Sequence, residues 1–262
     1  MTTLAARTID ALRHEHDDLA AVVAAFTDAE LTGPSGASEW SAAQVLSHLG
    51  SGSEIGLAGL QVALGLREPL DDSFNPSVWA RWDAMGPDEQ RSEYLRHNLT
   101  MVEAYEDLSA DQRESLQVPV PYLPAPISVA TYAGLRLSEA THHGWDARVA
   151  MDRGAALLDR STAVLLEHLA GDLGFLLGFI GKADRIADDV VLSLGDSGYS
   201  IAITDTVSLA SSADEPTATF SGPVEAALRL MVGRLGPAYT PAAVTVTGNV
   251  TLDELRSAFP GL

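Results

Sequence analysis

The spacing of apolar residues changes near residues 152–160 of this 262-residue chain, and the change limits the folds open to it. Before this point apolar residues recur at the three- and four-residue steps of amphipathic helices. After it, short runs rich in β-branched residues are separated by Gly, Asp and Ser turns, which is typical of strands. The sequence therefore predicts a helical domain, residues 1–155, followed by a smaller α+β domain, residues 156–262.

The first part contains four long helical patterns and a shorter one that begins at Asn75. The long helices are expected over residues 1–28, 41–66, 88–108 and 128–151. Ser41 and Gln44 have the spacing of a capping box at the start of the second helix. Four prolines between Val118 and Pro126 exclude a helix there. Four long helices predict a bundle, in which sites are built from side chains on facing helices.

The second part predicts one more long helix, over residues 161–180, and then a small sheet with two helices. Strands are expected at residues 190–194, 199–203, 207–209, 217–220 and 244–247. The two helices are expected at residues 224–232 and 252–259. Mixed strands and helices of this length are typical of a compact α+β domain.

Composition excludes several functions. The 36 acidic and 16 basic residues give a net charge of −20, which repels nucleic acids and anionic membranes, and no local basic patch offsets it. There is no cysteine, so disulfides, thiolate metal sites and a thiol nucleophile within the chain are excluded, and any thiol chemistry needs a second molecule. The amino terminus does not resemble a signal peptide, and the longest apolar stretch is interrupted by polar residues. We therefore expect a cytoplasmic protein.

Glu139 and His143 form the sharpest polar grouping in the chain. Residues four apart lie on one face of a helix, roughly 5–6 Å apart at Cβ, so a carboxylate and an imidazole there can reach one metal ion. Arg136 and Asp146 extend the same stripe at three-residue steps. The alternative is a solvated helix face with a Glu–His contact inside the helix.

His48 lies inside an otherwise apolar helical stretch. It is either a hydrogen-bonded core residue or a third ligand that faces Glu139 and His143 from another helix, since catalytic metal sites use three protein ligands and one open position. The spacing alone does not show that the two helices meet.

The other histidines have weaker surroundings. His142 points about 100° away from His143 around the helix, so we expect it to be structural. His14 and His16 are expected to be exposed, while His97 and His168 are expected to have no convergent partners. Loops that bind phosphate or dinucleotides and the nucleophile elbow of hydrolases are not found.

Three segments together resemble the mycothiol-dependent maleylpyruvate isomerase-like proteins. Glu39-Trp40-Ser41, followed by Val45-Leu46-Ser47-His48-Leu49, resembles the Gly-Trp-Ser/Thr and His-Leu signature of the second helix in that family. Members of the family commonly have Cys-Pro-Gly-Trp before this helix. Residues 37–40 of this chain keep only the tryptophan of that motif. The segment from Glu139 to Asp146 resembles the family's Glu-x-x-x-His-x-x-Asp helix. Gly222, residues 224–228, Gly233-Arg234 and residues 246–248 are similar to its carboxy-terminal domain.

The resemblance implies a DinB-like four-helix bundle followed by a small α+β domain akin to sterol-carrier proteins. It implies a divalent metal, usually zinc, held by His48, Glu139 and His143. Such a donor set also suits nickel, iron or manganese. Mycothiol would supply the thiol that the chain lacks. Asp146 would orient His143, or else is a solvated residue of the helix surface.

The activity implied is cis–trans isomerisation, in which the thiolate adds to the double bond of maleylpyruvate, the single bond rotates and elimination gives fumarylpyruvate. Arg136 and Arg234 are the candidates to bind substrate carboxylates, with structural salt bridges as the alternative for both. A mycothiol S-transferase would use the same metal and thiol. A non-catalytic protein that binds a metal or an apolar ligand is the alternative from another class. We expect a monomer or homodimer with small-molecule partners, without nucleic acid or membrane.

Overall fold

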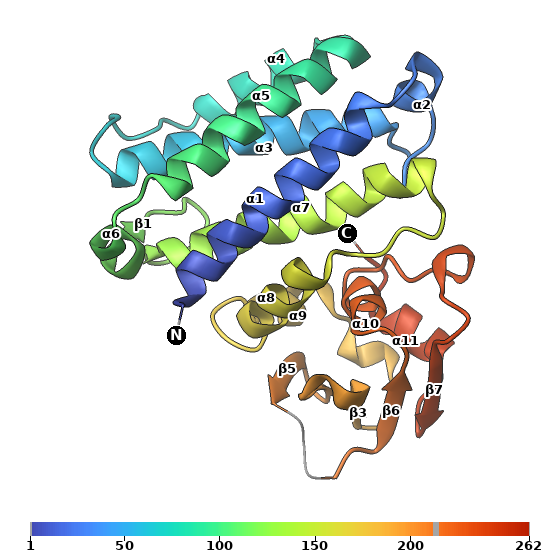
Figure 1. Ribbon diagram of the computed structural model, residues 1–262. Helices are drawn as coiled ribbons and strands as arrows, with labels where there is room; N and C mark the ends of the chain where they lie inside the picture. Colours follow the sequence, from blue (N-terminus) through green and yellow to red (C-terminus); the bar gives the residue numbers. More distant parts are fainter. Residues whose placement is uncertain (1, 212–214, 262) are drawn as a thin grey trace. The chain divides into compact units, whose positions relative to one another are not determined.

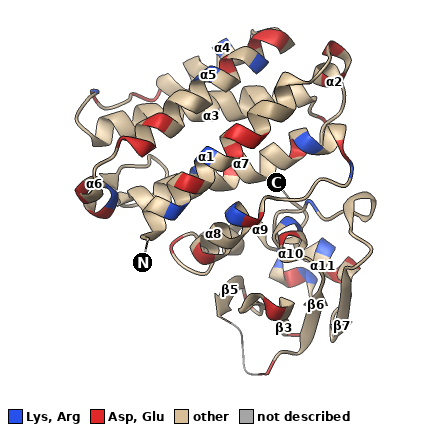
Figure 2. Ribbon diagram, in the orientation of Figure 1, with Lys and Arg blue, Asp and Glu red and all other residues tan. Residues whose placement is uncertain are grey.

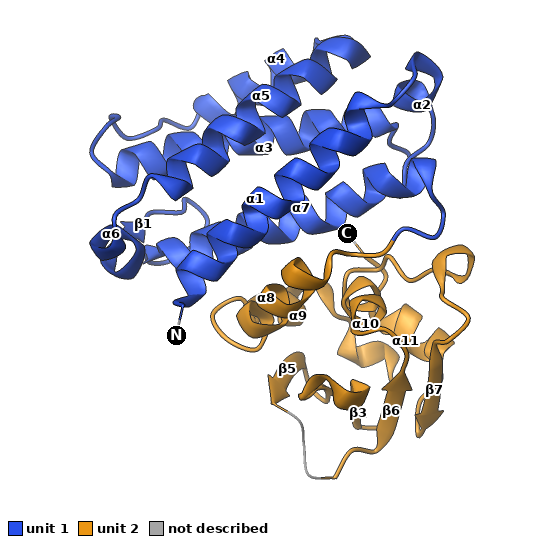
Figure 3. Ribbon diagram, in the orientation of Figure 1, with its two compact units in different colours: residues 1–155 blue, residues 156–262 orange. Residues whose placement is uncertain are grey.

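The computed structural model describes residues 2–211 and 215–261. The chain divides into two compact units, residues 1–155 and 156–262 (Figure 3). The first unit is helical, and the second contains a small sheet with helices (Figure 1). The predicted fold class, a helical part followed by an α+β part, is therefore confirmed.

Four long helices build the first unit (Figure 1). They are α1 (Leu4–Ala24), α3 (Ala42–Ala63), α5 (Pro87–Glu106) and α7 (Val129–Met151). Helix α3 packs against α5 and α7, and α1 packs against α7 and α5. One cluster of buried apolar side chains, which includes Leu46, Leu49, Trp82 and Tyr94, fills the space between helices. Burial of this apolar surface holds the bundle together.

Shorter elements connect the long helices. They are α2 (Asp28–Thr32), α4 (Phe74–Asp83), α6 (Ala110–Ser115) and the antiparallel pair β1 (Gln117–Val118) and β2 (Ile127–Ser128). The β1–β2 pair flanks the proline-rich segment, as the exclusion of a helix there requires. The predicted capping box of Ser41 and Gln44 is confirmed at the start of α3. The expectation of one helix over residues 1–28 is wrong, because Thr27 and Glu30 form a second capping box that begins α2.

A five-stranded sheet forms the centre of the second unit, with strand order β5-β4-β3-β6-β7. The strands are β3 (Val190–Ser193), β4 (Tyr199–Ile203), β5 (Val207–Ser211), β6 (Ala218–Ser221) and β7 (Thr245–Gly248). Strands β3 and β6 are parallel, and the other neighbours are antiparallel. The helices are α8 (Asp159–Leu169), α9 (Phe175–Ile180), α10 (Val224–Met231) and α11 (Leu252–Ala258). Short 3-10 helices occur at Ala183–Arg185, Gly195–Ser197 and Pro237–Tyr239.

The single helix predicted over residues 161–180 is two helices, α8 and α9. Between them the amide of Leu173 donates to the carbonyl of His168, so the chain turns after α8. Gly171 and Gly174 flank this turn, and glycine lowers the stability of a continuous helix by about 1 kcal/mol relative to alanine. Apolar residues keep a helical spacing through this turn, so the sequence pattern did not reveal that the helix is interrupted.

Acidic and basic positions occur along most helices of the first unit (Figure 2). Among the residues that the structure describes, no helix is both long enough and apolar enough to cross a membrane.

Candidate metal centre

Three potential metal ligands lie close together. They are the imidazole of His48 on α3 and the carboxylate of Glu139 and imidazole of His143 on α7. Nε2 of His48 lies 2.8 Å from Oε2 of Glu139, and Nε2 of His143 lies 3.8 Å from the same oxygen. The potential ligand atoms of all three residues lie within 4.8 Å of one another. Packing of α3 against α7 therefore brings together residues 91 positions apart in the sequence.

Each helix places its residue for a simple reason. Glu139 and His143 are one helical turn apart on α7, so their side chains share a face. His48 lies in the second turn of α3, whose start is fixed by the Ser41 capping box, and its neighbours Leu46 and Leu49 are fully buried in the bundle core. The apolar face of α3 thus fixes the rotation of the helix and places His48 at the edge that faces α7.

Asp146 holds the second ring nitrogen of His143. Nδ1 of His143 donates to Oδ2 of Asp146 at 2.9 Å, and Asp146 is fully buried. Because an ionised carboxylate only accepts hydrogen bonds, the proton of a neutral imidazole lies on Nδ1. The lone pair of Nε2 is then directed toward Glu139, which is the form of histidine that binds a metal.

The charge state of Glu139 also suits a metal ligand. Desolvation by burial favours its neutral form, but the hydrogen bond from His48 and the positive potential of His143, His48 and Arg136 outweigh it and lower the pKa to about 2. The side chain is therefore a carboxylate at neutral pH.

Trp40, just before α3, covers the two imidazoles. Its ring centroid lies 5.2 Å from that of His48 and 5.8 Å from that of His143. Sequence reasoning did not single out Trp40 as a site residue, although a tryptophan immediately before the capping residue of a histidine-bearing helix is a signal that could have found it. The residue before it, Glu39, has a φ of +70°, in the left-handed region.

The family model described as the mycothiol maleylpyruvate isomerase N-terminal domain matches residues 12–148. The chain belongs to this family. Two solved structures cover 95% of this chain and 98% of their own, with TM-scores of 0.64: the mycothiol-dependent maleylpyruvate isomerase, at 18% identity, and a histidine-to-alanine variant of it, at 17%. At this identity the likeness shows the fold. No curated protein matches the chain.

Glycine adopts a positive φ without steric cost, and the signature that residues 39–41 resemble begins with glycine. This chain has the left-handed backbone with a glutamate at that position.

Arg136, a candidate to bind substrate in this family member, lies inside the helical unit. Its Nη2 donates to the carbonyl of Leu49 at 2.8 Å, to Oγ of Ser53 at 2.9 Å and to Oδ1 of Asn98 at 3.1 Å. The residue is 7% exposed. Its positive charge acts on Glu139 from within the bundle, and its role toward substrate remains a prediction.

Arg234, the second candidate, belongs to the second unit. Its Nη1 donates to the carbonyl of Val232 at 3.2 Å. The preceding Gly233 has a φ of +74°, and a Cβ there would lie 2.4 Å from the backbone of Gly261. The Gly-Arg motif therefore has a structural reason for its glycine, and the role of the arginine stays a prediction.

Two expectations about the remaining histidines are wrong. His16 is buried, and its Nδ1 accepts from Nδ2 of Asn98 at 2.9 Å, because this side of α1 faces the bundle interior. His97 does have convergent partners, since its Nε2 lies 3.4 Å from Glu93 and 3.7 Å from Glu54. His168 is buried in the second unit. His142 is buried, as expected of a structural residue.

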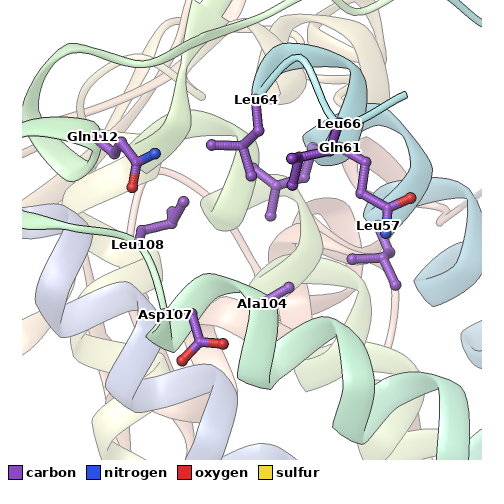
Figure 4. A pocket seen from close by; sticks show the side chains of 9 residues that line it. Leu57, Gln61, Leu64, Leu66, Ala104, Asp107, Leu108 and Gln112 are labelled. Atoms are coloured by element: carbon purple, nitrogen blue, oxygen red, sulfur yellow. The ribbon is translucent and has the colours of Figure 1, made fainter. Parts of the chain in front are cut away.

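A cavity of about 300 Å³ lies elsewhere in the first unit (Figure 4). Leu57 and Leu60 of α3 and Leu64 directly after it line the cavity together with Ala104 of α5 and the polar side chains of Asp107 and Gln112. None of the residues that line it belongs to the candidate metal centre.

Proposed function

We propose that His48, Glu139 and His143 bind a divalent cation, with Zn²⁺ as the first candidate, and that the protein is a mycothiol-dependent isomerase of the maleylpyruvate type. The observation that carries this proposal is the convergence of their three ligand atoms within 4.8 Å. The proposal is supported by membership of the mycothiol maleylpyruvate isomerase family and by a fold shared with that enzyme.

The donor set fits the proposed ion. Two imidazole nitrogens and one carboxylate oxygen are the ligands of many catalytic zinc sites, which keep a fourth position open. The same set also accepts nickel, iron or manganese. When bound, the ion would lower the pKa of a coordinated thiol, as it does for coordinated water.

The chain's own residues have separate tasks in this proposal. Asp146 keeps the proton of His143 on Nδ1, so that Nε2 is available as a ligand. Glu139 contributes a negative charge, which leaves a site with a net charge of about +1 with a dication. The chain contains no cysteine, so the thiol would come from mycothiol.

Substrate carboxylates need a cation, and Arg136 and Arg234 are the candidates for this task. The Nη2 atom of Arg136 already donates to three interior acceptors. Arg136 would then act on the site through its charge near Glu139 rather than by direct contact.

Metal analysis and turnover test the proposal together. Purified wild type should carry about one equivalent of metal and convert maleylpyruvate to fumarylpyruvate only with mycothiol. His48→Ala should lose both metal and turnover, while His14→Ala, at an exposed histidine of the same unit, should keep both. Equal metal content in wild type and His48→Ala would refute the site, and metal-loaded wild type without turnover would refute the isomerase.

The interior position of Arg136 favours a second candidate, a mycothiol S-transferase. Such an enzyme requires the thiol and the metal but no cation for a dicarboxylate substrate. Incubation with mycothiol and a generic electrophile such as monochlorobimane should then release a conjugate, with no turnover of maleylpyruvate.

A further inference from the structure

The indole of Trp40 packs against both imidazoles of the candidate metal centre. It is stacked on His143 with an interplanar angle of 26° and tilted by 47° against His48. The two imidazoles lie edge to face, with ring centroids 4.5 Å apart. Trp40 is 37% exposed, so the rest of the indole is covered by neighbouring groups.

The two histidines are oriented by different means. His143 is fixed through Nδ1, which donates to the buried carboxylate of Asp146. His48 is bonded through Nε2 to Glu139, and Nε2 is the atom that a metal ion would take. Once that bond is replaced by a metal–ligand bond, the His48 ring is kept in its plane by its contacts with the indole of Trp40 and the imidazole of His143.

Hydrogen bonds within residues 34–41 close the loop that carries Trp40. The carbonyl of Trp40 accepts from the amide of Ser35 at 3.1 Å and from its Oγ at 2.9 Å. Pro34 and Ser41 form an isolated antiparallel bridge across the base of the loop. Trp40 therefore stands on a closed loop of fixed shape.

The same loop is tied to the helix that carries His143. The amide of Gly36 donates to the carbonyl of Asp146 at 2.8 Å. A Cβ at Gly36 would lie 2.7 Å from Val149 and 2.9 Å from both Trp145 and Asp146, so loop and helix touch closely. One turn of α7 thus holds His143 through the Asp146 side chain and the Trp40 loop through the Asp146 backbone.

Glu39 shows that the loop conformation is imposed by its surroundings. A non-glycine residue with a positive φ is retained only where neighbouring structure determines the backbone. Such strain gathers at functional sites, and here it directly precedes the residue that contacts both imidazoles.

From these contacts we infer that Trp40 is a positioning residue of the metal centre, which acts on the ion through the ring plane of His48. The inference rests on the proposed metal site and adds a residue to it. The indole does for His48 what the carboxylate of Asp146 does for His143.

Metal affinity tests the inference independently of turnover. Competition of the metal-free protein with a chromophoric chelator for Zn²⁺ gives the dissociation constant of wild type, Trp40→Phe and Trp40→Ala. Loss of a group that orients a ligand typically weakens binding 10- to 100-fold, and we expect about tenfold for Trp40→Ala. Trp40→Phe keeps an aromatic face and should lose less. Trp79→Ala, at a half-exposed tryptophan of α4, should match wild type.

Two further measurements separate positioning from folding. Urea unfolding of the metal-free variants shows whether each is folded. If Trp40→Ala is not folded, the affinity of Trp40→Phe decides whether Trp40 has a positioning role. With Co²⁺ in place of Zn²⁺, the visible absorption of Trp40→Ala or Trp40→Phe should change in intensity, because a released His48 ring alters the coordination geometry.

The two proposals fail in different ways. Wild type that binds no Zn²⁺ would refute the metal site and this inference with it. Wild type that binds Zn²⁺, beside folded Trp40 variants with the same affinity and the same Co²⁺ spectrum, would refute the positioning role alone.

Discussion

Nδ1 of His143 donates to Oδ2 of Asp146 over 2.9 Å, and no part of Asp146 is exposed to solvent. A buried carboxylate of this kind fixes both the tautomer and the orientation of a ligand histidine. His143 and Asp146 are three residues apart on α7, so this hydrogen bond forms within one helix.

Asp146→Ala should weaken Zn²⁺ binding by about 10- to 100-fold, because the His143 ring loses the group that orients it. Asp146→Asn should lose less, since its amide oxygen still accepts a hydrogen bond. Chelator competition measures both. Asp205→Ala, at an exposed turn of the second unit, is the control and should bind as wild type. Unchanged affinity in folded Asp146→Ala would contradict the role of this carboxylate.

Glu39→Gly should raise the free energy of unfolding by about 1 kcal/mol. The left-handed conformation costs a non-glycine residue about 1–2 kcal/mol, and the greater freedom of glycine in the unfolded chain returns part of this. Glu39→Ala should leave stability near wild type, because alanine bears the same steric cost at a φ of +70°. Urea titration of the metal-free protein gives the comparison. A Glu39→Gly variant no more stable than Glu39→Ala would contradict a steric cost of the left-handed backbone at this position.

Gly36→Ala should be destabilising by about 1–3 kcal/mol, since its methyl group would overlap Val149, Trp145 and Asp146. It should also weaken Zn²⁺ binding, because the loop that carries Trp40 moves with it. Gly86→Ala is the matched control, as a Cβ there meets nothing within 4 Å. Thermal unfolding and chelator competition on the same samples report both effects.

Asn98→Leu should lower the free energy of unfolding by about 1.5–3 kcal/mol, because the buried charge of Arg136 loses an acceptor, and Ser53 and His16 also lose a hydrogen-bond partner. Adding Arg136→Met removes the charge that was left under-compensated, so the double variant should lose less than the sum of the two single changes. Urea unfolding of all four proteins gives the coupling energy. Strict additivity would show that the contact contributes nothing.

His16 makes stability depend on pH in a predictable direction. Burial is the main cause that lowers its pKa below 6.5, and Asp17 opposes it only in part. Between pH 6.5 and the lower folded-state pKa the unfolded chain binds the proton that the folded chain does not, so stability is present above 6.5 and falls as the pH drops below it.

Comparison of wild type with His16→Gln isolates this contribution, because every other titrating group is common to both. Urea unfolding of the metal-free proteins at pH 7.5 and 5.5 should show a larger loss for wild type. Equal losses would show that the buried ring is protonated in the folded state without cost.

Local signals predicted most of the helices and strands correctly. The capping box of Ser41 and Gln44 involves residues only three positions apart, and strand periodicity is visible within each short run. The errors occurred where local patterns continued across a change in the chain. Apolar spacing ran through the turn at Gly171–Gly174, and helical character ran through Thr27, where a new cap begins.

The burial of side chains away from their own helix was harder to predict. His16 has the same local sequence surroundings as exposed His14, and only the position of Asn98 on α5 makes its burial favourable. Arg136 looked like a free cation at the end of a polar stripe. Its three acceptors come from α3 and α5, which the stripe on α7 does not contain.

Glu139, His143 and Asp146 could be placed on one face of a helix from their spacing alone, because 3.6 residues per turn fix that relation without any other part of the chain. The positions of His48 beside this group and of Trp40 across both imidazoles could be known only from the packed fold. Those contacts depend on how the apolar faces of α3 and α7 pack against each other. His48 and Glu139 are 91 positions apart in the sequence, and that separation does not tell how far apart they lie in space.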